Sequence, residues 1–464
     1  WIELHNPTAA AIDLDGYQFD NGVEFTFPAV SIPAGGFLVV AADPTEFGAN
    51  FPAVTNVVGP WIGKLRNSGE KIALRDASGD LVDEIDYADE GDWAIRARGV
   101  SDRGHRGWTW EAGHDGGGSS LELINPALSN KAGQNWASSL VAGGTPGAEN
   151  SVASDDIAPL IREVQHRPKI PNSSDEITVR ARVTDESVSE PTVTLYWRLG
   201  GAVPFTAVAT TQSGDEHSAT IPAQADGAII EFFVSASDGG LTRDWPAEVV
   251  GGGHLANALI QVDDSHDRSQ AAVGGEQGIY RVIMTETERA ELEEIGTNSN
   301  QSESNAEMNA TFISADGTGT SVRYLASIRN RGASSRTGPP NNHLVKFRSD
   351  DPWDGISSIK FNARYVHSQV AGAWLFQRLG IEADDGVAAQ LRINAGDLAD
   401  PGGPRMYGSY AMLEQFDSDW TAAHFPLDGN GNLYQVRDDE DTGDEGDLRY
   451  EGDDPDAYRN TYCK

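Results

Sequence analysis

Six basic residues lie close together in a stretch of the chain that has no acidic residue. This stretch runs from Gly317 to Ser349 and contains 33 residues without Asp or Glu. Its bases are Arg323, Arg329, Arg331, Arg336, Lys346 and Arg348. Arg and Lys bind phosphate oxygens through charge-assisted hydrogen bonds. The stretch therefore indicates a site for a phosphate-bearing ligand, and the alternative is that these bases pair with acidic neighbours.

The chain as a whole is strongly acidic. Its 464 residues include 34 Lys and Arg against 71 Asp and Glu, which gives a net charge of −37. Proteins bind nucleic acids and anionic lipids by neutralising phosphates with cations. The composition thus argues against nucleic acid as a partner. The longest apolar run has about six residues, against roughly 20 for a membrane-spanning helix, so we expect no membrane span.

Two acidic patterns could bind a hard cation. Asp428, Asn430 and Asn432 have the spacing of a calcium-binding loop, but Leu433 stands where such a loop needs glycine. The run from Asp438 to Asp456 holds eleven acids and one base, which is typical of a solvated surface. We expect weak calcium or magnesium binding there at most.

The sequence around the basic stretch predicts both strands and helices. Thr285 and Glu288 have the spacing of a capping box, and Gly296 and Gly380 are typical of helix ends. The predicted elements are helices over 286–295 and 366–379 and a hairpin with strands over 311–314 and 320–329. This part of the chain is therefore predicted to be α+β.

Short alternating runs separated by Gly, Pro, Asn and Asp fill the first half of the chain. This pattern predicts β-sandwich domains, here over residues 1–151 and 157–263 with a polar linker between them. In the first of these, Trp108 and Trp110 are predicted to be core residues rather than a platform for stacking sugars.

Residues 1–151 resemble the lamin-tail domain, with the first strand missing. The resemblance rests on WIELHNP (1–7), IDLDGY (12–17), FTFP (25–28), IPAGGFLVV (32–40), GGGSSLELINP (116–126) and GTPGAENS (144–151). It implies an immunoglobulin-like sandwich that serves as a surface or interaction module, without catalytic residues. The strand spacing over 157–263 resembles an immunoglobulin or fibronectin type III sandwich.

Residues 278–464 are similar to the spore-coat protein H (CotH) kinase family in six ordered motifs. These are IRNRGASSR (328–336), KF (346–347), LGI (379–381), LRIN (391–394), YGSY to Glu414 (407–414) and GNLY (431–434). The resemblance implies an atypical kinase fold that uses ATP and Mg²⁺ to phosphorylate secreted or cell-surface proteins. It also implies a bacterial protein located outside the cell or at its surface.

The same resemblance implies which residues bind the nucleotide. They are Arg331, Arg336 and Lys346 at the phosphates, and Glu414 and Gln415 near the adenine. The family's catalytic and metal-binding aspartates follow the GNLY motif at some distance, so they are expected beyond Lys464. This chain by itself is then expected not to catalyse phosphoryl transfer. The predicted architecture is two all-β immunoglobulin-like sandwiches followed by an α+β atypical protein-kinase-like domain, incomplete at its C-terminus.

Two other functions stay open at this point. The chain could be a non-catalytic adhesion or scaffold protein of the cell surface, in which a degenerate kinase fold binds a partner through its acidic face. The sandwiches could also bind carbohydrate in a calcium-dependent way. Fold alone does not decide between these functions.

Overall fold

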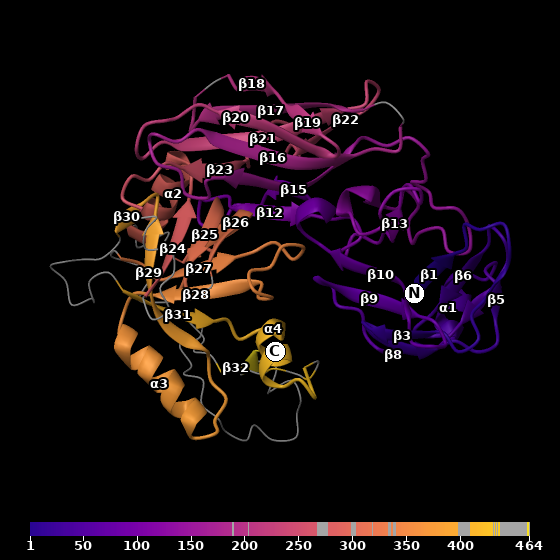
Figure 1. Cartoon of the computed structure of the whole chain (residues 1–464). Helices are drawn as coiled ribbons and strands as arrows, with labels where there is room; N and C mark the ends of the chain where they lie inside the picture. Colours follow the sequence, from indigo (N-terminus) through magenta and orange to yellow (C-terminus); the bar gives the residue numbers. More distant parts are fainter. Residues whose placement is uncertain are drawn as a thin grey trace.

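The computed structural model describes residues 1–187, 190–202, 204–266, 277–297, 303–317, 319–332, 336, 340–397, 409–429, 431, 433, 435–436 and 462–463. Strands dominate it, and they form several separate sheets (Figure 1). Three regions follow one another along the chain: an N-terminal region, a middle region and a closed-sheet region. Among the described residues, no helix has the length and apolar character needed to cross a bilayer.

Two small sheets enclose the core of the N-terminal region, with strand orders β1-β6-β7 and β10-β9-β3-β4-β8. Phe19, Phe27, Leu38 and Val40 are buried between these sheets. The strands are β1 (Ile2–His5), β2 (Ile12–Asp13), β3 (Gln18–Asn21), β4 (Val23–Thr26), β5 (Ser31–Ile32), β6 (Phe37–Val40), β7 (Val57–Val58), β8 (Ile62–Gly63), β9 (Gly69–Arg75) and β10 (Leu81–Ala88). Helix α1 (Pro44–Asn50) packs beside them, capped by Asp43.

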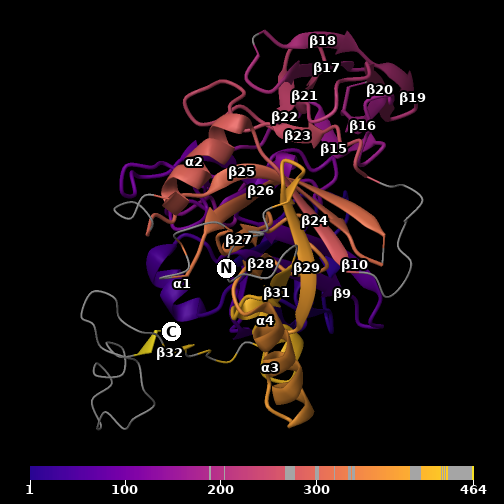
Figure 2. The same ribbon diagram turned by 90° about the vertical axis from the view of Figure 1, so that its left-hand side faces the viewer.

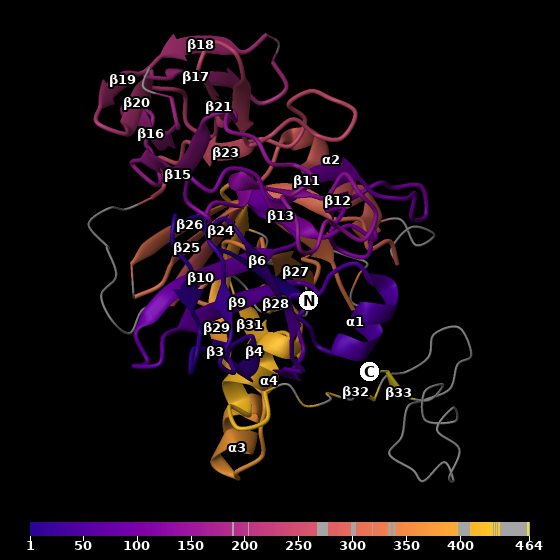
Figure 3. The ribbon, with the colours of Figure 1, turned by 90° about the vertical axis from the view of Figure 1, so that its right-hand side faces the viewer.

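A second set of short strands continues the N-terminal region toward the other two regions. They are β11 (Ile95–Arg98), β12 (Trp108–Glu111), β13 (Leu121–Leu123) and β14 (Trp136–Ser138), with 3₁₀ turns at Gly91–Trp93 and Gly133–Asn135. In Figures 1 and 3, β12 and β13 lie between the middle region and strands β9 and β10.

Trp108 joins all three regions. Its ring is buried against Val249 and Ala256 of the middle region. Its indole Nε1 donates to Glu288 Oε1 at 2.6 Å, and its backbone N donates to Glu307 O at 2.8 Å. Trp108 is therefore a core residue, as predicted, but that core lies between regions and not inside the N-terminal sandwich.

The middle region consists of two antiparallel sheets, ordered β15-β16-β20-β19 and β18-β17-β21-β22, with β23 also paired to β21. In β16, alternate residues from Ile177 to Val183 are buried, because every second side chain of a strand faces the opposing sheet. The strands are β15 (Leu160–Arg167), β16 (Ile177–Thr184), β17 (Thr192–Leu199), β18 (Thr206–Ala209), β19 (Thr211–Ser213), β20 (Glu216–Ile221), β21 (Ile229–Ser237), β22 (Thr242–Trp245) and β23 (Ala258–Gln261).

One sheet of the third region closes on itself. Its strands follow the order β24-β25-β26-β27-β28-β31-β29, and β29 pairs in parallel with β24 to complete the ring. They are β24 (Gly278–Ile283), β25 (Met308–Ala315), β26 (Thr320–Asn330), β27 (His343–Lys346), β28 (Ser358–Asn362), β29 (Gly386–Ile393) and β31 (Tyr410–Glu414), with the short β30 (Gly396–Asp397) at one edge and a separate pair, β32 (Gln435–Val436) and β33 (Tyr462–Cys463).

Alternation along the strands decides what fills the closed sheet. Ile328, Val345, Ile359 and Phe361 belong to the buried core inside the ring. Successive side chains of a strand point to opposite faces, so Lys360 lies on the outer face of β28.

Among its described residues, the closed-sheet region has three helices: α2 (Glu286–Thr297), α3 (Val366–Arg378) and α4 (Ser418–His424). Figure 2 shows α3 beside β29 and β31, and Val366 of this helix packs against Ala411 and Leu413 of β31. The predicted helices over 286–295 and 366–379 are confirmed to within two residues, and the predicted hairpin is formed by the longer strands β25 and β26.

The middle region covers another part of the outer face. Ile283 and Ile313, on β24 and β25, pack against Leu259 of β23. Tyr324 of β26 enters the core of the middle region, where its hydroxyl lies 2.5 Å from His166 Nδ1. The outer faces of β27 and β28 lie between the sector covered by the middle region and the sector covered by α3.

Replacing Trp108 by Phe should lower the free energy of unfolding by about 1–3 kcal/mol, because Glu288 stays buried while losing a hydrogen-bond donor. Urea unfolding followed by circular dichroism measures this loss. Trp110→Phe is the control, since Trp110 is only partly buried, and it should cost less. If Trp108→Phe is as stable as the unmodified chain, the hydrogen bond from Trp108 to Glu288 does not stabilise the contact between the regions.

Acidification should weaken the contact between the middle region and the closed sheet. Burial lowers the pKa of His166 to about 4 from its ordinary value of 6.5. The unfolded chain then takes up the proton first, so this stabilisation is complete above pH 6.5 and is lost as the pH falls toward 4. Between pH 7 and pH 5 the loss is about 2 kcal/mol.

Urea unfolding at pH 7, 6 and 5 tests this expectation. His166→Gln should show a shallower fall in stability with acidification than the unmodified chain. His367→Gln, which changes an exposed imidazole on α3, should leave the slope unchanged. If His166→Gln has the same slope as the unmodified chain, the pH dependence arises elsewhere.

Candidate functional site

The structure brings only some of the six bases of the Gly317–Ser349 stretch together. Arg329 and Arg336 both donate to Asn305 Oδ1, at 2.9 and 2.8 Å. Both are near enough to Arg331 to lower its pKa. Four of the six bases form ion pairs: Arg323 with Asp351 at 3.1 Å, Arg329 with Glu307 at 3.9 Å, Arg348 with Asp350 at 2.7 Å, and Lys346 with Glu307. For these four, pairing with acidic neighbours describes the structure better than a common phosphate site.

Lys346 lies at the junction with the N-terminal region. Together with Glu90, Arg96 and Trp108 it lines a cavity of about 310 Å³ between the N-terminal and closed-sheet regions. Burial raises the pKa of Glu90 to about 7, and Arg96 opposes this shift. The lysine that the family resemblance assigns to the phosphates thus faces this cavity, where Glu307 neutralises it.

Arg336 connects two segments of the closed-sheet region. Its guanidinium donates to the backbone oxygens of Gly332 and Ser304 and to Asn305 Oδ1, the last two at 2.9 and 2.8 Å. These contacts fasten the segment after β26 to the segment before β25. Arg336 therefore has a structural role in the conformation described here.

Arg331 differs from the other bases. It directly follows β26, and its Nη1 donates to Asn362 Oδ1 at 2.6 Å. Within the part of the chain that the structure describes, its guanidinium forms no ion pair. Burial, together with the nearby Arg329 and Arg336, lowers the pKa of Arg331 to about 10. A partly buried cation without a paired carboxylate can bind an anion.

Lys360 lies on the same face of β28 as Asn362 and is a buried cation close enough to Arg331 to be affected by its charge. Its Nζ lies 3.0 Å from Asp384 Oδ2 and 4.6 Å from the centre of the Phe416 ring. Burial lowers the pKa of Lys360, Asp384 opposes this, and Arg331 lowers it further. Among the described residues, Asp384 Oδ1 is buried without a hydrogen-bond partner.

Asn362 connects Arg331 to α3. Its amide Nδ2 donates to Gln369 Oε1 at 2.6 Å, while its Oδ1 accepts from Arg331. Gln369 in turn donates to the backbone oxygen of Arg364. The site thus comprises Arg331, Lys360, Asn362, Gln369 and Asp384, and we call it the β28 site.

Arg331 is among the residues predicted from the sequence, whereas Lys360 is not. The available signal was the pattern Ser-Ile-Lys-Phe-Asn at 358–362, in which one lysine interrupts the apolar alternation of a strand. A lysine at such a position is buried when the outer face of the strand is covered. It then needs an acidic partner, which Asp384 supplies from a distant loop.

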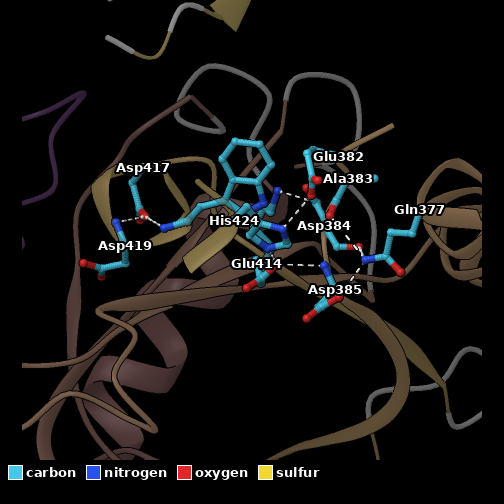
Figure 4. Close-up of polar contacts among 11 residues, drawn as sticks. Gln377, Glu382, Ala383, Asp384, Asp385, Glu414, Asp417, Asp419 and His424 are labelled. Carbon is cyan, nitrogen blue, oxygen red and sulfur yellow. Dashed lines mark hydrogen bonds and ion pairs between the residues drawn. The ribbon is translucent and has the colours of Figure 1, made fainter. Parts of the chain in front are cut away.

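Glu414 and Gln415, the residues predicted near the adenine, end β31 and follow it. Glu414 Oε2 accepts from Asp385 N at 2.7 Å and lies 2.9 Å from His424 Nε2. The other ring nitrogen of His424 lies 3.2 Å from Glu382 (Figure 4). Burial lowers the pKa of His424, but the hydrogen bonds to both glutamates outweigh it and raise the pKa. Gln415 is partly buried next to this cluster.

Two predicted cation sites fall outside the described residues. Asn430 and Asn432 of the calcium-loop pattern and the acidic run from Asp438 to Asp456 have no structural description. Weak calcium binding there stays a prediction.

Comparisons with known proteins add three findings. A family model described as Lamin Tail Domain matches residues 1–89. No curated protein matches the chain. Among the solved structures, a match to "Titin kinase and its flanking domains" has 10% sequence identity and a TM-score of 0.14, and it covers 56% of this chain and 38% of that chain. The lamin-tail resemblance is thus confirmed for residues 1–89, whereas the CotH resemblance of residues 278–464 stays a prediction.

Proposed function

We propose that the β28 site binds the triphosphate of a nucleotide and that the protein acts as an atypical kinase of secreted or cell-surface proteins. The observation that carries the proposal is the charge of the site. Arg331 and Lys360 bring two cations to one face, and Asp384 supplies one carboxylate in contact with Lys360. The Asp417 carboxylate also acts on Lys360, so Arg331, which forms no ion pair among the described residues, is the cation left for a ligand that carries several negative charges.

The parts of this site match those that phosphoryl transfer requires. In protein kinases, a strand lysine contacts the phosphates and an acidic residue holds it in an ion pair. Lys360 is a strand lysine of this kind, and Asp384 is its acidic partner from the loop after α3. Arg331 adds a planar guanidinium, which fits phosphate oxygens bidentately.

Asp384 offers an oxygen for the Mg²⁺ ion, in addition to the aspartates that the family resemblance assigns to the metal. Asp384 Oδ1 is a buried oxygen without a partner among the described residues, and Mg²⁺ is commonly held by one or two carboxylates plus phosphate oxygens. Asp384 would hold the ion through this oxygen. The bound ion supplies neutralisation of phosphate charge.

The family resemblance further supports the substrate class, secreted or cell-surface proteins. The N-terminal and middle regions then act as attachment or partner-binding modules. Lys346 and Arg336 have no place in the proposed nucleotide site, because Glu307 neutralises the former and the loop oxygens engage the latter.

Arg331→Ala should weaken binding of ATP with Mg²⁺ by roughly 10- to 100-fold, because charge-assisted hydrogen bonds contribute about 1.5–3 kcal/mol. Isothermal titration calorimetry of the present chain measures the affinity. Lys346→Ala is the matched control, since it removes another cationic side chain, one that faces the N-terminal cavity. It should leave the affinity unchanged.

Lys360→Met with Asp384→Asn tests the buried pair without leaving a single buried charge, and it should also weaken binding. Circular dichroism of each variant separates lost binding from lost folding. If ATP with Mg²⁺ does not bind the unmodified chain, or if Lys346→Ala weakens binding as much as Arg331→Ala, the β28 site is not the nucleotide site. Absence of binding would favour the non-catalytic scaffold.

A further inference from the structure

We infer that Asp385, Glu414 and His424 form a binding site for a first-row divalent cation of the zinc type. Each residue offers one ligand atom, and these atoms lie within 4.8 Å of one another. Figure 4 shows Asp385 and Glu414 next to the His424 ring. Ligand atoms about 2.0–2.2 Å from a tetrahedral zinc ion are roughly 3.3 Å apart. Asp385 Oδ1 accepts from Gln377 Nε2 at 2.6 Å, so a small movement of this exposed side chain, with loss of that hydrogen bond, completes the site.

The surroundings of His424 supply what a metal-binding histidine needs. Its Nε2 faces Glu414 at 2.9 Å, and its Nδ1 faces Glu382 at 3.2 Å. A metal-bound histidine almost always donates its other ring N–H to a carboxylate or carbonyl, which fixes the ring and makes it a better ligand. Glu382 is in place as this outer partner, so Nε2 is free to bind the ion when its proton leaves.

The ring is also held in orientation before any ion binds. Trp420 of α4 stacks on it, with 4.8 Å between ring centroids and 24° between planes. Asp417 caps the helix by accepting from the backbone N of Asp419 and Trp420. Because these contacts position the ring, ion binding needs little reordering on the helix side.

Three separate elements would share the ion: the loop between α3 and β29, the end of β31, and α4. One imidazole and two carboxylates are a ligand set that suits zinc and other first-row divalent ions better than calcium or magnesium, which prefer oxygen alone. With three protein ligands and an exposed Asp385, the fourth position is open to water.

The bound ion would also act on the β28 site. Asp385 follows Asp384 directly, and Asp384 is the partner of Lys360. Fixing Asp385 restricts the loop that places Asp384. The inference itself does not depend on nucleotide binding, because it rests only on the contacts of His424 and its neighbours.

Calorimetric titration of the chelator-treated chain with ZnCl₂, in buffer with excess MgCl₂ to occupy oxygen-only sites, tests the inference. We expect one tight equivalent of Zn²⁺. His424→Ala should weaken it on the order of 100-fold or more, and Glu382→Gln roughly 10-fold. His367→Ala, which removes an exposed imidazole of α3, should have no effect. Substituted Co²⁺ should show the visible absorption of a four-coordinate ion.

Absence of a tight equivalent in the unmodified chain would overturn the site, and so would unchanged affinity in His424→Ala. If circular dichroism shows that His424→Ala is unfolded, Glu414→Gln and Glu382→Gln decide. Loss of affinity in both, with folding intact, supports the site. Unchanged affinity in both refutes it.

Discussion

The parallel pairing of β24 with β29 is the constraint on which the closed-sheet region depends. Its register places Tyr280 opposite Leu391 and Val282 opposite Ile393, and all four residues point into the core. Because the sheet closes, each strand has one fixed inner face. A slip of one residue would exchange the two faces, so the closure also decides that Lys360 lies outside. The chemistry of the β28 site is thus a consequence of the packing inside the ring.

The loop from Glu382 to Asp385 connects the two candidate sites. Asp384 reaches Lys360, whereas the backbone N of Asp385 donates to Glu414, which His424 also contacts. Consecutive residues therefore serve different partners, one on β28 and one on β31. Gln377 of α3 also holds the loop, through hydrogen bonds to Ala383 O, Asp384 O and Asp385 Oδ1. A cation bound at Asp385 and an anion bound at Lys360 would therefore both act on the conformation of this loop.

Local signals in the sequence predicted local structure well. Thr285 was predicted to cap α2, and its Oγ1 does accept from Glu288 N at 3.3 Å. The Glu288 side chain does not complete the capping box. Its carboxylate instead accepts from Trp108 Nε1 and from Asn309 N at 2.5 Å. The partner of Glu288 lies 180 residues away in the chain, so no short-range pattern could indicate it.

The same limit explains the site residues. The acid-free stretch contains Arg331, which the structure leaves without an ion pair among the described residues, and also Lys346, whose neutralising partner Glu307 precedes the stretch in sequence. Lys360 lies after the stretch and was missed. Charge composition along a chain measures proximity in sequence, whereas neutralisation depends on proximity in space. Proximity in space depends on the register between strands and on the placement of loops, and both follow from closure of the sheet.

The buried carboxylate of Glu288 has a further consequence for how the regions are joined. A buried carboxylate is costly unless hydrogen bonds surround it, and its donors here come from the N-terminal region and from β25. Arg96 adds a second link, donating to Leu325 O at 2.7 Å. Separating the regions would remove the hydrogen-bond partners of both the Glu288 carboxylate and the Arg96 guanidinium. The segment after the lamin-tail match is therefore built into the closed-sheet region, and it forms one wall of the cavity that Lys346 faces.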